Sequence, residues 1–159
     1  MLDVSGASSG QIQFPATQNP STNVNTLDDY EEGSWTPTIS FSTSNGDLSY
    51  SVQVGRYVKI GKTVTIECNI QFSETTASGG ITIGGLPFTT ANVTNLIPQF
   101  PVGVENMTLI VGAPVGQINV NMTTMSMRYT GTGTQSLIDN TNTGANSAFR
   151  FGFTYIAEQ

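Results

Sequence analysis

The chain has 159 residues, of which 37% are hydrophobic and only 10% are charged, and it carries a formal net charge of −6. Its five basic residues form no cluster, which argues against nucleic-acid binding and against electrostatic docking on anionic lipid. No segment reaches the ~18–20 apolar residues of a membrane span, so we expect no membrane insertion. Histidine is absent, which removes the commonest general base and zinc ligand.

The first 33 residues differ from the rest because they are polar, contain two prolines and carry only isolated apolar side chains. Such a segment cannot bury enough surface to fold alone. We therefore predict that residues 1–33 form an extended N-terminal arm, either a loose linker or a strap on a neighbouring subunit, and that residues 34–159 form the folded domain. The carboxylates at its end, Asp28, Asp29, Glu31 and Glu32, lack calcium-loop spacing and are expected to be solvated.

Alternating apolar residues begin at Trp35 and continue through Ile39 and Phe41. Pro37 within that run indicates an edge strand or a strand start, because proline cannot donate to a β-ladder. Asn45-Gly46 predicts a turn, and Gly61-Lys62 predicts another.

The clearest predicted strand covers residues 64–72, where every second residue is apolar and polar residues lie between them. This pattern indicates an antiparallel sheet with one buried face and one solvated face. Cys68 lies on the apolar phase, and we expect it to be a buried, unreactive side chain.

The remaining chain also predicts strands and turns rather than helices. Residues 89–116 are irregular with one short strand at 107–111, and a phase change at Thr123-Thr124 indicates a bulge or a turn. Residues 131–146 form a polar loop, and the last strand carries an aromatic row from Phe149 to Tyr155. Eight to eleven short strands predict an all-β fold, a β-sandwich or jelly roll, with a closed barrel as the alternative.

Four segments resemble parts of bacteriophage tail fibres and tailspikes: the first two resemble the junction between an upstream shaft or catalytic β-helix and the C-terminal domain, and the last two resemble that C-terminal domain itself. These are residues 10–18, Gly-Gln-Ile-Gln-Phe-Pro-Ala-Thr-Gln; residues 25–37, Asn-Thr-Leu-Asp-Asp-Tyr-Glu-Glu-Gly-Ser-Trp-Thr-Pro; residues 55–61, Gly-Arg-Tyr-Val-Lys-Ile-Gly; and residues 84–88, Gly-Gly-Leu-Pro-Phe. The resemblance covers roughly residues 10 to 90. It implies a parallel homotrimer at the distal end of a phage tail in the virion, downstream of a fibre shaft or a catalytic β-helix.

The expected function follows from this resemblance and from the residue types. We expect a domain that trimerises and caps the fibre end and contacts host surface polysaccharide; the alternative is a dedicated carbohydrate-binding module. The side chains expected at a trimer interface, some of which could equally belong to the core, are Ile12, Phe14, Leu27, Tyr30, Trp35, Phe151 and Phe153. The side chains expected to bind glycan are Tyr129, Asp139, Asn140 and Asn142, since amides and carboxylates on loops can hydrogen-bond vicinal hydroxyls. We expect no catalytic residues, metal or cofactor.

Overall fold

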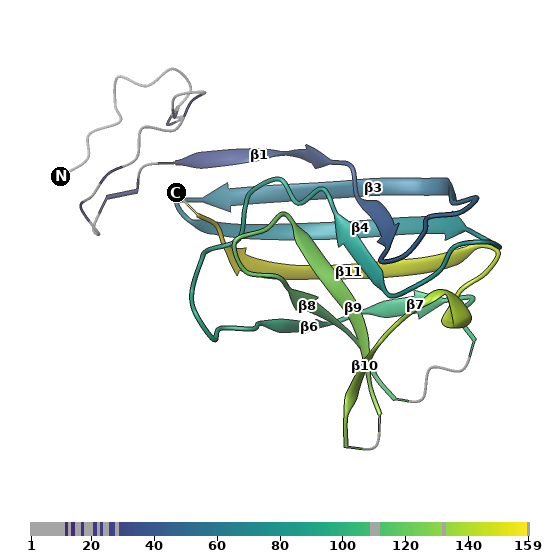
Figure 1. Cartoon of the computed structure of the whole chain (residues 1–159). Coiled ribbons are helices and arrows are strands. Elements are labelled where there is room, and N and C mark those ends of the chain that lie inside the picture. Colours follow the sequence, from purple (N-terminus) through teal and green to yellow (C-terminus); the bar gives the residue numbers. More distant parts are fainter. Residues whose placement is uncertain are drawn as a thin grey trace.

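The structure, a computed structural model, describes residues 12, 14, 17, 21, 23, 26–27, 29–108, 112–131 and 133–158. Two antiparallel sheets pack face to face, with five strands in one and six in the other (Figure 1). The prediction of an all-β sandwich is therefore confirmed. No α-helix occurs within the described ranges, and none of their helices is long and apolar enough to cross a membrane.

The five-stranded sheet has the order β1-β3-β4-β11-β7. Its strands are β1 (Tyr30–Trp35), β3 (Ser49–Ile60), β4 (Thr63–Ser73), β7 (Gly103–Glu105) and β11 (Ser147–Ile156). β3 and β4 form a long hairpin in which Ile60 pairs with Thr63 across the predicted Gly61-Lys62 turn. Gly61 has a φ of 56°, which an L side chain rarely adopts, so glycine suits this turn.

The six-stranded sheet has the order β2-β5-β9-β8-β6, with β10 also paired to β9. Its strands are β2 (Thr38–Phe41), β5 (Ile81–Gly84), β6 (Gln99–Pro101), β8 (Pro114–Ile118), β9 (Thr124–Thr130) and β10 (Gln135–Leu137). β2 is an edge strand and Pro37 directly precedes it, as the missing amide donor predicts. The phase change at Thr123-Thr124 is explained by the turn that joins β8 to β9.

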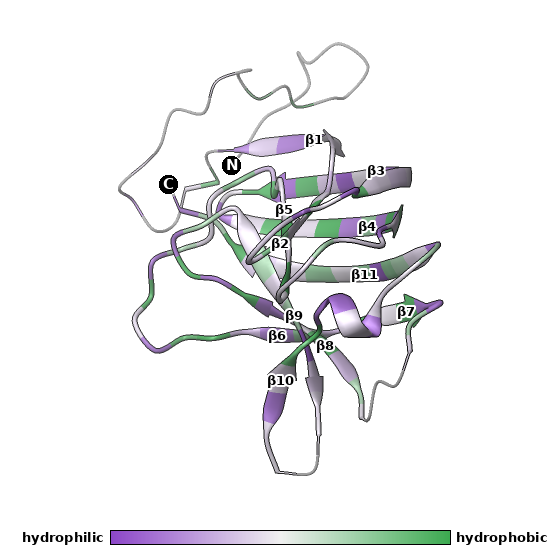
Figure 2. Ribbon diagram, turned by 45° about the vertical axis from the view of Figure 1, so that its right-hand side comes forward, coloured by the Kyte–Doolittle hydropathy of each residue, from purple (hydrophilic) through white to green (hydrophobic). Residues whose placement is uncertain are grey.

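The core lies between the sheets and is filled by the apolar phase of each strand. Along β4 the side chains of Val64, Ile66, Cys68, Ile70 and Phe72 are all buried, and the alternation of hydropathy along the strands is visible in Figure 2. Each fully buried large side chain stabilises the fold by about 1.5–3 kcal/mol relative to exposure. The strand predicted at residues 64–72 and the buried Cys68 are therefore confirmed.

The aromatic row of β11 packs inside one chain. Phe153 stacks on Phe100 of β6, with ring centroids 3.8 Å apart and an interplanar angle of 12°, and Phe151 lies 5.2 Å from the same ring. Phe151 is only 8% exposed and Trp35 only 7%. Trp35 and Phe151 therefore belong to the core of a single chain, whereas Phe153 is only half-buried and its place in a trimer interface stays a prediction.

The start of the folded domain differs from the predicted boundary between residues 33 and 34. β1 begins at Tyr30 and pairs along its whole length with β3. Asp29, just before it, is 1% exposed and forms an ion pair with Lys59, which is 2% exposed and lies over the Phe88 ring. The expectation that this carboxylate is solvated is therefore wrong, because the inward-facing ammonium of Lys59 requires a counter-charge. Asp28 lies outside the described residues.

The predicted polar loop at residues 131–146 also contains regular structure. β10 pairs with β9 as a hairpin, and a short 3₁₀-helix follows at Asn140–Asn142. Of the strand predicted at 107–111, residues 107 and 108 are irregular and residues 109–111 lie outside the described part of the chain.

Candidate functional site

The four residues predicted to bind glycan all contact other residues of the same chain. The Asp139 carboxylate accepts hydrogen bonds from the amide and the hydroxyl of Thr141 at 2.8 and 2.6 Å. Asn142 is only 7% exposed. Its side chain accepts a hydrogen bond from the Asp139 amide at 3.1 Å and so completes a capping box. The Asn140 side chain accepts from the amide of Gly79 at 3.0 Å, and Tyr129 packs against the core.

The glycan site predicted at Tyr129, Asp139, Asn140 and Asn142 stays a prediction, since all of these residues except Asn142 are partly exposed. A loop that is not paired in a sheet must satisfy its backbone donors by other means, and short polar side chains are the usual acceptors. Asp139, Asn140 and Asn142 therefore hold the segment in shape, each through one side-chain oxygen that accepts hydrogen bonds from within the chain.

A different polar surface lies on the outer face of the five-stranded sheet, which is the face turned away from the core. The β3–β4 hairpin register determines which residues point there. Since Val64 and Ile66 point inward, their partners Lys59 and Tyr57 do as well, and the alternate residues of β3 point outward. The outward set includes Arg56 and Val58 of β3, paired with Glu67 and Thr65 of β4.

These residues line a shallow groove of about 560 Å³, here called the outer groove. Its lining residues are Glu32, Gly33, Arg56, Tyr57, Val58, Thr65 and Glu67. Arg56 Nη2 lies 2.7 Å from Glu67 Oε2, and the two side chains are 75% and 65% exposed. Val58, 38% exposed, supplies an apolar surface between Glu32 and Thr65, with which it pairs on its two sides.

Further hydroxyl groups border the outer groove. Tyr30 donates from its hydroxyl to Glu32 Oε2 at 2.9 Å, and this hydrogen bond to a carboxylate raises the pKa of Tyr30. Thr65 and Thr154 share a hydrogen bond of 3.0 Å between their hydroxyl oxygens. The groove thus combines carboxylates, one guanidinium and hydroxyls around an apolar centre, which is a surface suited to a polyhydroxylated ligand.

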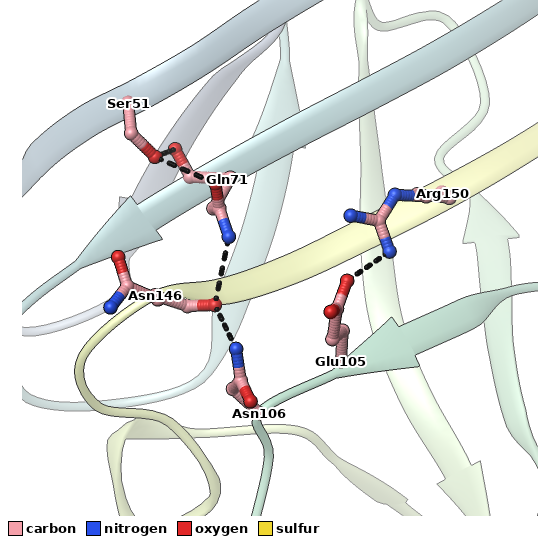
Figure 3. A network of polar contacts seen from close by, with 6 residues as sticks. All are labelled: Ser51, Gln71, Glu105, Asn106, Asn146 and Arg150. Carbon is pink, nitrogen blue, oxygen red and sulfur yellow. Dashed lines mark hydrogen bonds and ion pairs between the residues drawn. The ribbon is translucent and has the colours of Figure 1, made fainter.

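The opposite end of the same face has its polar groups paired with one another (Figure 3). Arg150 of β11 forms an ion pair with Glu105 of β7. The carbonyl oxygen of Asn146 accepts from the Asn106 side chain at 3.0 Å and from the Gln71 side chain at 3.4 Å. This end of the face provides a comparison for the outer groove, since it lies on the same sheet and has the same kind of exposed ion pair, but Arg150 and Glu105 do not line that groove.

The described residues contain no group of three or more His, Cys, Asp or Glu side chains that could hold a metal ion. Cys68 is buried in the core, and burial raises the pKa of its thiol to about 12. The thiolate needed for nucleophilic attack is therefore disfavoured at neutral pH.

Three of the arm side chains predicted for a trimer interface are exposed in the single chain. Ile12, Leu27 and Tyr30 are 57%, 58% and 42% exposed. Phe14 is partly covered, and its ring centroid lies 6.3 Å from that of Tyr30. These four side chains are therefore accessible for contact with another molecule, and their place in an interface stays a prediction.

Sequence reasoning missed the outer groove although a local signal for it existed. Arg56 lies five residues before Gly61 and Glu67 lies five residues after Lys62. A two-residue turn at Gly61-Lys62 therefore places the two side chains directly opposite each other on one face. No such signal predicted that Glu32 lines the groove, because the Gly61-Lys62 turn does not determine how β1 pairs with β3.

The fold is similar to part of a phage tailspike. The crystal structure of the Dettilon tailspike protein (gp208) matches with a TM-score of 0.67 and 20% sequence identity. The match covers 80% of this chain and 24% of that chain, so the chain spans about a quarter of the length of that tailspike. No protein-family model matches the sequence, and no curated protein matches it. The likeness confirms the prediction of a tailspike-related fold.

Proposed function

We propose that this chain is a non-enzymatic domain of a phage tail fibre or tailspike that assembles as a homotrimer at the distal end of the tail and contacts host surface glycan. The similarity in fold to a segment of a tailspike is the observation that carries this proposal. In such a protein the domain would follow a fibre shaft or a catalytic β-helix and would cap it.

The outer groove is the proposed glycan contact. Carboxylates and guanidinium groups hydrogen-bond vicinal hydroxyls, and the Val58 side chain can pack against the apolar face of a sugar ring. The groove carries two carboxylates and one guanidinium, so its charge is −1, within a chain of net charge −6. Electrostatic repulsion at this charge disfavours acidic polysaccharides. Neutral or amino sugars are therefore the proposed ligand class.

The absence of catalysis is part of the same proposal. No histidine is present to activate a hydroxyl or thiol nucleophile. In the groove, Glu67 is paired with Arg56 and Glu32 accepts a hydrogen bond from Tyr30. Both carboxylates are thus held by a partner within the chain rather than placed as the free acid and base pair of glycoside hydrolysis.

Binding to immobilised neutral bacterial polysaccharides tests the glycan contact, with Arg56→Ala and Arg150→Ala as matched variants. Both substitutions remove the arginine of an exposed ion pair on the same face, but only Arg56 lies in the outer groove. A lost hydrogen bond to a charged group is worth about 1.5–3 kcal/mol, so Arg56→Ala should weaken binding at least ~10-fold. Equal affinities of the two variants, or release of oligosaccharide by the parent protein, would contradict the proposal.

A further inference from the structure

A second surface has a chemistry opposite to that of the outer groove. Five exposed apolar side chains gather at the end of the sandwich where β11 finishes, here called the terminal apolar patch: Val93, Leu96, Ile97, Met122 and Ile156, each 47–58% exposed. Backbone hydrogen bonds bring their segments together, since the amide of Ala91 donates to the Ile156 carbonyl at 2.8 Å and the amide of Thr90 donates to the Met122 carbonyl at 3.0 Å.

A groove of about 210 Å³ opens within this patch, here called the end groove. Its apolar lining includes Val93, Leu96, Pro98, Ile118, Val120 and Ile156. A dry cavity of about 150 Å³ holds a benzene molecule, so the end groove has room for one leucine or phenylalanine side chain. Contiguous exposed apolar surface of this kind marks a site of contact with another apolar group.

The N-terminal arm joins the sandwich at the same end. Tyr30 pairs with Ile60, Ile60 with Thr63, and Thr63 with Ile156, so the first residue of β1 and the edge of the end groove lie on one row across four strands. With strands ~4.8 Å apart, this row spans about 14 Å. Leu27 is three residues before Tyr30 and can extend only about 10 Å from it.

Leu27 is not among the residues that line the end groove of its own chain, and its side chain is 58% exposed in the single chain. Arm and groove are different surfaces at one end of the molecule. A contact between two different surfaces is heterologous, and rotation about a threefold axis closes such contacts into a ring in which each arm meets the groove of the next copy.

We infer that the end groove receives the Leu27 side chain from the N-terminal arm of a second copy of this chain. The inference rests on the proposed homotrimer and specifies where its subunits meet. Contact between Leu27 and the terminal apolar patch in all three copies would remove part of the apolar surface that one chain leaves in water.

Disulfide trapping in the full chain tests this contact. In a Cys68→Ala background, Leu27→Cys is combined with Leu96→Cys, or with Val54→Cys as the control. Val54 is 55% exposed, like Leu96 at 53%, but lies in β3 outside the terminal apolar patch. We expect oxidation to link the Leu96→Cys variant into covalent trimers on a non-reducing gel and to link the Val54→Cys control at least ~10-fold less.

Light scattering of the parent and of Leu96→Glu separates this inference from the proposed function. The parent should give a mass of about three times 16.9 kDa, and Leu96→Glu should give the mass of one chain. If the parent is trimeric, three results would overturn the inference and leave the homotrimer standing. These are equal linking in the two cysteine pairs, a disulfide inside one chain, and trimers that persist in Leu96→Glu. A monomeric parent would overturn both.

Discussion

Substitution of Lys59 by methionine should destabilise the fold strongly. The Lys59 and Asp29 side chains are 3% and 1% exposed and form an ion pair inside the protein. Methionine keeps most of the apolar stem of Lys59 but leaves the Asp29 carboxylate buried without its counter-charge. Breaking a buried pair in this way costs about 3–5 kcal/mol.

The partner substitution Asp29→Asn should cost less, because Lys59 keeps two other favourable contacts. Its ammonium lies 3.9 Å from Glu31 Oε1 and 4.9 Å from the centre of the Phe88 ring. We expect a loss of about 1–3 kcal/mol, the cost of one hydrogen bond to a charged group. The double variant should be more stable than Lys59→Met alone, since neither buried charge remains.

Urea unfolding at one fixed protein concentration, followed by the fluorescence of Trp35, the single tryptophan, measures these free energies. The control is Arg56→Met, which breaks an ion pair on the same strand that is 75% and 65% exposed and should cost no more than about 1 kcal/mol. A cost below ~1 kcal/mol for Lys59→Met, or strict additivity in the double variant, would refute the reasoning from burial.

Three further predictions concern the core. Trp35→Ala should destabilise by about 3–5 kcal/mol in urea unfolding followed by circular dichroism. Gly55→Ala should cost about 1–3 kcal/mol, because an added Cβ would lie 2.4 Å from Trp35 Nε1; additive losses in the double variant would argue against this contact. Burial raises the pKa of Cys68 to about 12, so the stability from its protonated thiol is complete below pH ~8.5 and is lost at up to ~1.4 kcal/mol per pH unit above it. Unfolding at pH 8, 9 and 10 should therefore show a steeper decline for the parent than for Cys68→Ala, and parallel declines would contradict the assignment.

The sequence determined the β3–β4 hairpin almost completely. The strict alternation from Val64 to Phe72 identifies the buried phase of β4, and the Gly61-Lys62 turn sets its register with β3. These two signals are local, so no distant contact was needed to predict them. The aromatic row of β11 is predictable for the same reason, although alternation alone does not distinguish a core from an interface for Phe151.

The partners of the polar groups depend on contacts between segments that are distant in the sequence. The hairpin register turns Lys59 toward the interior because it pairs with Val64, yet its partner Asp29 lies 30 residues away and arrives only when β1 pairs with β3. In the same way, the oxygens of Asp139 and Asn142 could have faced a ligand or the backbone, and the fold directs them to the backbone. Alternation records which side of a strand is buried, but a counter-charge or a hydrogen-bond partner depends on contacts between distant segments, which no local pattern encodes.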